Sequence, residues 1–467
     1  MAAVNSEPSS ASARPPYASS SMRPVELLSN PLLPPPFGPS SSYAQTSQGR
    51  NWRFSHSKLS SIRSAINASA RDRLSTLWAE ESSSTSPSTI PFLSVSDELS
   101  LITYYLVKVS QIVHALRLPE LVEATATTFV KRFYLRNTVM DFHPKNIVIT
   151  CIFLASKAEN YPLNLSDFAR KLAGRQANEN RALVEENRKV VLELEFLVSQ
   201  SLNFEYGVTG AHRSMYGLLL DIQAMEKVKV GREEVHMLAA EAHGKLGKSR
   251  LTDAEFVYTP SQIALACVRM VEPKGKEVVT SWLDWKEELA RNAGLEAKKR
   301  RVQVREQETA RAAKAKIALA RRLKGKAGAK IAEDQVAAAA SIPSGEVEFE
   351  DELLETQPLG MSRHELEAVL DEIQKMIEET ENGGYTGKGK GADDLERIKA
   401  IDARQKQCMN PENVPGTKLF RKRRAEDDGE EEEAEGRSGK RARGADSDDD
   451  ADVPEADGLR AKPDPQV

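Results

Sequence analysis

The chain has 467 residues, and 65 Lys and Arg against 69 Asp and Glu leave a formal net charge of −4. This near-neutral total excludes a uniformly basic coat protein for nucleic acid. The three cysteines lie too far apart in the sequence for a disulfide framework or a paired-cysteine zinc clamp, which is typical of a reducing intracellular compartment. No apolar run is close to the length of about 18 residues that a membrane-spanning helix needs, so we expect a soluble intracellular protein.

Both ends of the sequence lack the apolar pattern of a folded domain. Residues 1–50 contain 12 Ser and 9 Pro, and we expect them to be disordered. Residues 413–467 alternate basic and acidic blocks, with eight acids among residues 426–435, and we expect a disordered charged tail. The basic clusters of this tail, 418–424 and 440–443, match the pattern of a nuclear import signal.

Between these ends, apolar residues recur at the three- and four-residue spacing of helices that bury one face. The pattern begins near Leu59, breaks in the Ser-rich stretch 82–88, and runs on from Asp97 to about residue 290 with hardly any strand-like alternation. We expect Ser96 to cap the first helix after the break and Pro119 to open the next one. The sequence therefore predicts an all-α fold.

One later helix is apolar on every side. From Ile147 to Ala155 only Thr150 is polar, which is typical of a short helix at the centre of a bundle. A second helix starts in the same way at Thr259-Pro260, with a capping-box pattern. A shift of 116 residues matches Leu135 with Leu251, Phe142 with Tyr258, Pro144 with Pro260, Ile147 with Ile263, Ile149 with Leu265 and Cys151 with Cys267. Coincidence between two ordinary helix starts is the alternative, but a duplicated helical domain is the better explanation.

Four segments of the sequence carry a family resemblance. They are NWRFS at 51–55, KRFYLRNTVMDFHPKNIVITCIFLASKAEN at 131–160, LNFEY at 202–206 and LTDAEFVYTPSQIAL at 251–265. These segments resemble the cyclins, and within them the cyclin H group. The resemblance covers about residues 50–290 and resumes weakly near 361–410. It implies two tandem cyclin-box repeats of five helices each, with extra helices at both ends and disordered tails.

The resemblance implies a regulatory function without catalysis. Such a protein binds and activates a cyclin-dependent kinase of the CDK-activating type, which also serves in the general transcription factor TFIIH, and it supports phosphorylation of the RNA polymerase II C-terminal domain. The implied partners are this kinase, a third assembly subunit of the CDK-activating kinase and the TFIIH core, and the implied location is the nucleus. We expect no cofactor, no metal, no membrane association and no direct nucleic-acid binding.

The resemblance also points to four residues at the kinase-binding face. Lys157 and Glu195 match a lysine and a glutamate that form a polar pair in cyclins, whereas Leu154 and Phe204 match apolar contact positions. On periodicity alone, Lys157 would complement a helix C-terminus and Glu195 would be a solvated charge, and both apolar residues could belong to the core. Asn160 stands where many cyclins have an acid, so the contact is expected to be looser or differently distributed.

A basic segment interrupts the second repeat. Residues 296–330 hold 13 Lys and Arg against three Glu, which predicts a long basic helix, either a solvated insertion or a contact for nucleic acid or a phosphoprotein. An amphipathic pattern returns at 361–379, with Leu366, Val369, Ile373 and Ile377 on one face. The predicted divisions are a disordered segment at 1–50, an N-terminal helix and linker at 51–94, the first repeat at 95–206, the first part of the second repeat at 207–290, the basic insertion at 291–358, the end of the second repeat at 359–380, a C-terminal helical extension at 381–412 and a disordered charged tail at 413–467.

Other functional classes can be compared with this interpretation. The segment GKLGKS at 244–249 suggests a phosphate loop, but position 242 is Ala where the motif needs Gly, and the segment continues a helix. A cyclin C-like transcription cyclin would share the repeats and pair with another kinase. A transcription-factor-B-like DNA-binding protein should carry an N-terminal zinc ribbon, yet residues 1–100 contain no cysteine. An inert helical scaffold would activate no kinase.

Overall fold

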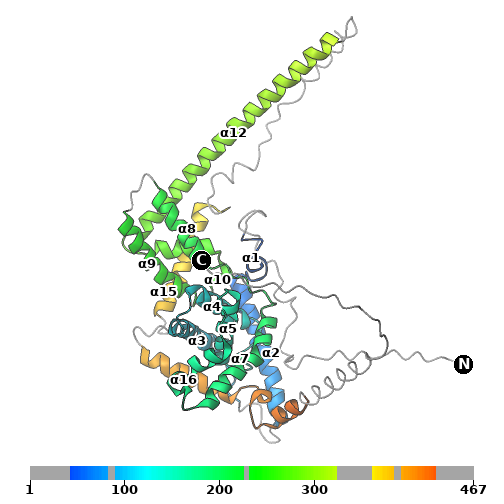
Figure 1. Ribbon diagram of the computed structural model, residues 1–467, viewed down its shortest axis with the longest axis vertical. Coiled ribbons are helices and arrows are strands. Elements are labelled where there is room, and N and C mark those ends of the chain that lie inside the picture. The colour runs from blue at the N-terminus through cyan, green and yellow to red at the C-terminus, as the bar shows by residue number, and fades with distance from the viewer. Residues whose placement is uncertain (1–42, 82–89, 226–230, 323–359, 383–390, 427–467) are drawn as a thin grey trace, which may run out of the picture.

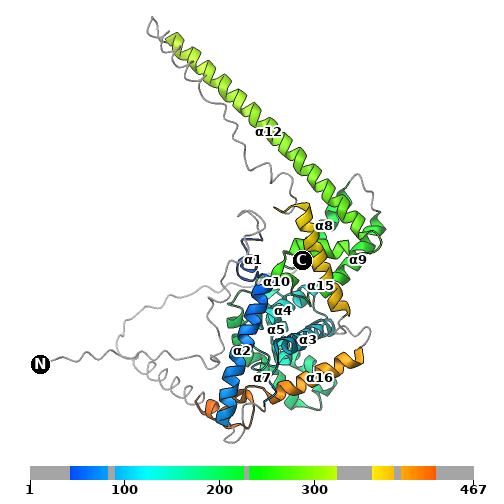
Figure 2. The same ribbon diagram turned by 180° about the vertical axis from the view of Figure 1, so that it is seen from behind.

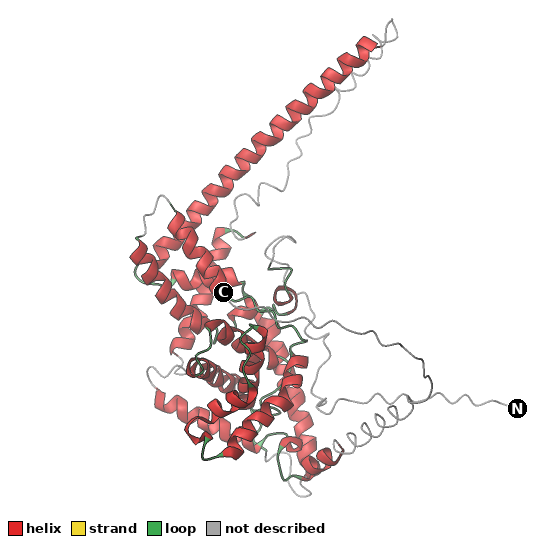
Figure 3. Cartoon of the chain, in the orientation of Figure 1, coloured by secondary structure: helices red, strands yellow, loops and turns green. Residues whose placement is uncertain are grey.

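The computed structural model of the chain describes residues 43–81, 90–225, 231–322, 360–382 and 391–426. Within these ranges the chain consists of helices and connecting loops, with no strand, as Figure 3 shows. The prediction of an all-α fold is confirmed. None of the described helices is both long enough and apolar enough to cross a membrane. Most of the two expected disordered tails, residues 1–42 and 427–467, lies outside the described residues.

The first repeat surrounds the helix that was predicted to be apolar on every side. Its helices are α3 (Val95–Ala115), α4 (Glu120–Phe133), α5 (Pro144–Ala158), α6 (Leu165–Ala173), the 3-10 helix η3 (Gly174–Ala177) and α7 (Arg181–Ser201). The central helix, α5, buries every residue from Ile147 to Ser156 and packs against α3, α4 and α7. Figures 1 and 2 place it inside the bundle from both sides. The predicted central position is confirmed.

The second repeat surrounds a central helix in the same way. Its helices are α8 (Ala211–Ala224), α9 (Arg232–Ser249), the single turn α10 (Ala254–Val257), α11 (Pro260–Arg269), α12 (Gly275–Arg322) and α15 (Arg363–Asn382). The predicted capping box forms at α11, where Gln262 Oε1 accepts the Thr259 N–H at 2.9 Å. α11 packs against α8, α9, α12 and α15. The matched Cys151 and Cys267 are both 0% exposed in the two central helices, which favours duplication over coincidence.

The basic segment is part of a longer helix. We expected a boundary between residues 290 and 291, but α12 passes through this point without a break. Its first turns bury Val279 and Leu283 in the second repeat, whereas the described side chains from residue 295 to residue 315 are exposed. Ala, Lys, Arg and Glu are strong helix formers, so the helix continues after its apolar face has ended. Figures 1 and 2 show it extending away from the body.

α15 closes the second repeat, in the region of the amphipathic pattern at 361–379. Its side chains enter the same core as α11 at Leu366, Leu370, Ile373 and Ile377, each 1% exposed or less. Val369, which was also expected to face inward, is only partly buried against this core. Residues 323–359, between α12 and α15, lie outside the described residues.

Two helices precede the first repeat and join the two repeats together. They are α1 (Ser47–Asn51) and α2 (His56–Glu81). α2 buries Ile62 in the core of the second repeat and Leu74 in the core of the first. Residues 47–50 were expected to be disordered, and that expectation is wrong, since they form most of α1. The Thr46 side chain caps this helix by accepting the Gly49 N–H at 3.0 Å.

The chain after the second repeat returns to the first repeat. This part contains α16 (Gly391–Gln407) and the 3-10 helix η5 (Pro411–Asn413), and α16 packs against α3. Residues 413–426 were expected to be disordered, but residues 418–426 are helical. The N–H groups of Lys418 and Leu419 donate to the Glu81 carboxylate at 2.8 and 3.0 Å. A negative charge at the N-terminal end of a helix stabilises it, which is why this basic segment is ordered against α2.

The start of α3 corrects one predicted cap. The capping residue is Ser94, not Ser96. The Ser94 hydroxyl accepts the Asp97 N–H at 3.2 Å, and the Asp97 carboxylate accepts the Ser94 N–H at 3.2 Å. These two hydrogen bonds require an acidic residue three positions after the capping serine. Ser94 has Asp97 at that position, whereas Ser96 has no acidic residue there. Pro119 lies at the start of α4, as expected.

Candidate functional site

The predicted polar pair is formed on the surface of the first repeat. Lys157 lies in the last turn of α5 and Glu195 lies on α7, and the Lys157 Nζ donates to the Glu195 Oε1 at 2.6 Å. The two side chains are 44% and 26% exposed. The Lys157 ammonium also lies 4.4 Å from the centre of the Phe153 ring, which is itself buried. An aromatic face attracts a cation, so the lysine is held in place from two sides.

The chain reverses sharply after Lys157, and Asn160 makes the reversal. Asn160 has a φ of 60°, in the left-handed region that Asn adopts more readily than most residues. The Asn160 N–H donates to the Lys157 carbonyl at 3.2 Å, and the Tyr161 N–H donates to the Ser156 carbonyl at 2.8 Å. These two bonds make a Schellman ending, which fixes the last turn of α5. Asn160, which departs from the family pattern, therefore stabilises the last turn of α5, where Lys157 lies.

Exposed apolar side chains lie on α7 and on the turn that follows it. Leu192 and Phe196 are 51% and 53% exposed, and Leu192 shares a face of α7 with both Glu195 and Phe196, since residues three or four apart share a face. Phe204, which is 55% exposed, packs on Phe196 with ring centres 6.2 Å apart. Leu154 is only 6% exposed, so it supports this surface from below and offers little area of its own. We call Leu192, Phe196 and Phe204, together with the polar pair, the α5–α7 face.

Two members of the α5–α7 face were missed from the sequence. Leu192 and Phe196 are not among the four residues to which the family resemblance points. The buried residues of α7 include Val191 and Val198, which are seven positions apart and therefore on one side of the helix. Phe196 is out of phase with that buried side. A large apolar residue outside the buried stripe is the signal that could have found it.

Phe204 has an unusual backbone conformation. Its φ is 58°, and that of Asn203 is 55°. Asn tolerates the left-handed region, but for a bulky residue such as Phe this conformation is a genuine outlier that costs free energy. The Phe204 N–H donates to the Ser199 carbonyl at 2.9 Å, which ends α7 at this point. The ring is thereby turned towards solvent beside Phe196.

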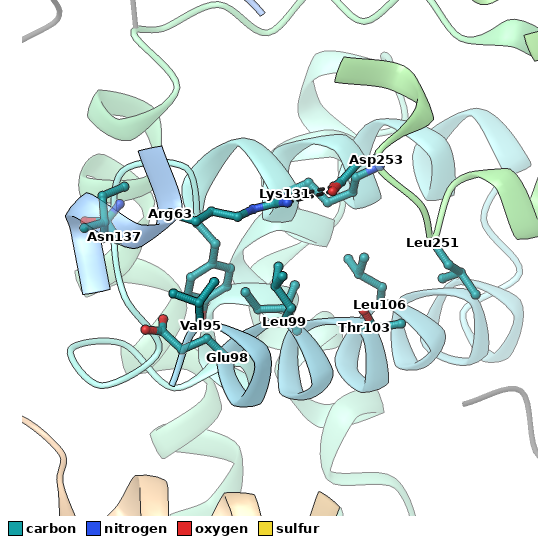
Figure 4. A pocket seen from close by; sticks show the side chains of 13 residues that line it. Arg63, Val95, Glu98, Leu99, Thr103, Leu106, Lys131, Asn137, Leu251 and Asp253 are labelled. Atoms are coloured by element: carbon teal, nitrogen blue, oxygen red, sulfur yellow. Dashed lines mark hydrogen bonds and ion pairs between the residues drawn. The ribbon is translucent and has the colours of Figure 1, made fainter. Parts of the chain in front are cut away.

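A pocket lies between the repeats, where α2 meets the loop before α10. The Arg63 guanidinium bonds both carboxylate oxygens of Asp253, at 2.6 and 2.7 Å. Although burial raises the pKa of the Asp253 carboxyl, the hydrogen bonds and charge of Arg63 outweigh it and leave this pKa below its ordinary value. Figure 4 shows Arg63, Lys131 and Asp253 along one wall, with Leu99 and Leu106 of α3 along another. The cavity volume of about 50 Å³ has room for a few waters, not for a nucleotide.

The described residues offer little for chemistry or metal binding. Among them, no group of three or more His, Cys, Asp or Glu side chains could hold a metal ion. The phosphate-loop look-alike at 244–249 forms the last turns of α9. Its backbone N–H groups are therefore used within the helix, and the end of α9 carries a partial negative charge that would repel a phosphate. This geometry agrees with the rejection of a phosphate loop from the sequence.

Comparisons with known proteins agree with this architecture. The family described as "Cyclin, N-terminal domain" matches residues 75–206, and the family described as "Cyclin C-terminal domain" matches residues 210–378. The "Probable cyclin-H" of Echinococcus multilocularis is 30% identical over 243 residues, which cover 48% of this chain and 70% of that protein. The chain belongs to the cyclin family, in its cyclin H branch.

Two further matches show how much of this cyclin is shared with known proteins. Cyclin CCL1 of Saccharomyces cerevisiae is 33% identical over 254 residues, which cover 52% of this chain and 61% of that protein. A chain in the solved structure of the CAK complex of Chaetomium thermophilum bound to ATP-gamma-S has a TM-score of 0.54 and 21% identity. The alignment covers 88% of this cyclin and 98% of that chain, and it establishes the shared fold.

Proposed function

We propose that this cyclin is a non-catalytic subunit that binds and activates a cyclin-dependent kinase of the CDK-activating, TFIIH-associated type. In that role it supports phosphorylation of the RNA polymerase II C-terminal domain. Membership of the cyclin H branch supports the type of kinase. The observation that carries the binding site is the ion pair of Lys157 and Glu195, held at 2.6 Å among exposed aromatic side chains.

The mechanism is a shift of the kinase between conformations. A kinase alone samples states in which its catalytic Lys–Glu ion pair is broken. A cyclin that binds only the assembled state pulls the population towards it. A change from 1:99 to 99:1 needs about 5.5 kcal/mol of differential binding free energy. A few interface anchors can supply this, because single hot spots contribute about 2 kcal/mol or more.

The α5–α7 face has the composition that such an interface needs. Its centre is a pair of opposite charges already fixed in the free protein, so little conformational entropy is lost when the kinase's main chain binds to it. Phe196, which follows Glu195 on α7, packs on Phe204, and both are more than half exposed. Aromatic side chains at an interface bury a large area with few rotatable bonds, and they exclude water from the charges they border. Lys157 and Glu195 are thus the proposed polar contacts, and Phe204 is a proposed apolar one.

A charge exchange tests the polar contacts. We expect Lys157→Glu combined with Glu195→Lys to keep an ion pair between α5 and α7, and so to keep the fold, yet to lose kinase activation because the kinase meets reversed charges. The assay is co-expression with candidate kinases, followed by phosphorylation of a polymerase C-terminal-domain peptide. The matched control is the same exchange at Glu296 and Lys299, a pair 3.0 Å apart on the exposed part of α12. Wild-type activity in the first variant, with its circular dichroism melt unchanged, would sink the assignment.

The remaining partners and the location follow from the same proposal. A third assembly subunit and the TFIIH core are the expected further partners. The nucleus is the expected location, with the basic clusters 418–424 and 440–443 as the import signal. Replacing its Lys and Arg by Ala should leave a fluorescent fusion in the cytoplasm when the kinase partner is absent. Nuclear entry of that variant without the partner would contradict the signal.

A further inference from the structure

The backbone on both sides of Phe204 is fixed by distant residues. Before it, the Asn203 side-chain oxygen accepts a bond from Arg136 Nη1 at 2.6 Å. After it, the Glu205 carbonyl accepts a bond from Arg132 Nη1 at 3.1 Å. An outlier φ at a bulky residue persists only where the surroundings determine it. The restraints on its two neighbours are therefore what keep Phe204 in its unusual conformation.

The N-terminal segment holds the same turn through the Glu205 carboxylate. Asn51 Nδ2 donates to one carboxylate oxygen at 2.6 Å, and Trp52 Nε1 donates to the other at 2.5 Å. Both oxygens are thus occupied by residues 153 and 154 positions away in the sequence. Hydrogen bonds to a carboxylate are stronger than bonds between neutral groups, and two of them restrict its rotation.

The donors are themselves fixed in place. The Trp52 ring is 1% exposed and lies beneath two guanidinium groups, with Arg132 at 4.8 Å and Arg136 at 5.6 Å from the ring centre. Burial lowers the pKa of Arg132 to about 10. Gln48, in α1, completes the anchor because its side-chain oxygen accepts the Thr209 N–H at 2.8 Å. The N-terminal segment and the loop after α7 therefore form one connected unit.

We propose that Asn51 and Trp52 are positioning residues for kinase activation, which hold Glu205 and thereby present Phe204 on the α5–α7 face. The inference rests on the proposed function, since it concerns how the same face is kept ready for the kinase. Neither residue needs to touch the kinase. The N-terminal segment acts on the α5–α7 face through the turn at Phe204. Removing its hydrogen bonds to Glu205 therefore lowers the affinity for the kinase while the two repeats stay folded.

Conservative variants of the donors separate this role from general stability. Trp52→Phe keeps the buried ring beneath the two arginines and removes only the N–H donor, and Asn51→Ala removes the other. Glu205 is left intact, because its loss would remove the acceptor of both donors at once, including that of the buried Trp52 Nε1. Arg50→Ala is the matched control, since Arg50 lies in α1 and its side chain bonds no described residue other than the nearby Gln45, at its carbonyl.

Two measurements on the full chain test the proposal. The first needs no kinase: hydrogen exchange at the Phe204 and Glu205 amides should speed up about ten-fold or more in the double variant Asn51→Ala/Trp52→Phe. The second is a double-mutant cycle with Phe204→Ala. The double variant should lose about ten-fold in kinase affinity when Phe204 is present and almost nothing when it is absent, because its effect passes through that ring.

Each result decides one question. Faster exchange with the non-additive loss of affinity supports the proposal, provided that the melting temperature stays within the range of the Arg50→Ala control. Unchanged exchange, or an equal loss of affinity with and without the Phe204 ring, overturns it. If the wild-type chain activates no cyclin-dependent kinase, the proposed function fails, and the exchange result still tells whether the N-terminal segment holds the turn.

Discussion

The two central helices start alike and end differently. α5 and α11 both begin at a proline 116 positions apart and bury a matched cysteine, but α5 has 15 residues and α11 has 10. The additional turn of α5 carries Lys157. Its counterpart under the same shift is Pro273, which cannot continue a helix. The duplication thus supplied two similar cores, and a one-turn extension of one of them supplied the lysine of the α5–α7 face.

The surfaces of the repeats differ in the same direction. In the first repeat, the helix that carries the ion-paired Glu195 also carries the exposed Phe196, which packs on Phe204. The exposed apolar residues of the second repeat include Tyr216 and Leu220 on α8, which are 53% and 66% exposed. The second repeat also has an ion pair between its central helix and its last helix, formed by Arg269 of α11 and Asp371 of α15. The two cores are alike, so the proposed kinase binding depends on the surface residues that distinguish the first repeat.

The largest expected effect is on the core of the second repeat. Ile373→Ala should lower the free energy of unfolding by about 2–5 kcal/mol, because it opens a cavity at a fully buried position of α15. A urea titration followed by circular dichroism measures the loss. Val304→Ala on α12, at a position 56% exposed, is the control and should change stability by less than about 0.5 kcal/mol. Equal melts for the two variants would mean that α15 does not close the repeat.

A smaller effect is expected when apolar residues of the two surfaces are compared. Phe196→Ala should weaken kinase binding about 30-fold, since a hot spot contributes about 2 kcal/mol. Leu220→Ala removes a side chain that is even more exposed, but on the second repeat, and should leave binding unchanged. Titration of the purified kinase against each variant gives the two affinities. A loss for Leu220→Ala as large as that for Phe196→Ala would contradict the assignment of the binding surface to the first repeat.

The helical fold and its two central helices could be predicted from local patterns. The run from Ile147 to Ala155 is apolar at every phase of a helix, and only burial on all sides satisfies such a run. The capping box at Thr259 uses a spacing of three residues, so it too is readable in the sequence. The same spacing, from Ser94 to Asp97, identifies the cap of α3, so the prediction of Ser96 was avoidable. These features depend on residues close together in the chain.

The features that escaped prediction depend on residues far apart. α1 was expected to be disordered because residues 1–50 lack an apolar face, yet its surroundings include Arg132 and the loop at Thr209. The left-handed turn at Phe204 is fixed by Asn51 and Trp52, which no local pattern connects with it. The pairing of Lys157 with Glu195 came from a family resemblance, since periodicity alone favoured two independent surface charges. Contacts of this kind require the fold to be known.

The smallest effect is expected at the outer part of α12. Replacing residues 296–356 by a short Gly/Ser linker should leave the melting temperature and kinase activation unchanged. The described side chains of α12 from residue 295 to residue 315 are exposed, so their removal uncovers no core, and loop-closure entropy varies only with the logarithm of loop length. The buried turns around Val279 and Leu283 stay in the variant. Circular dichroism and the kinase assay check the two expectations. A large loss of melting temperature or of kinase activation would mean that this basic segment belongs to the activating fold, and that the second repeat also contributes to kinase activation.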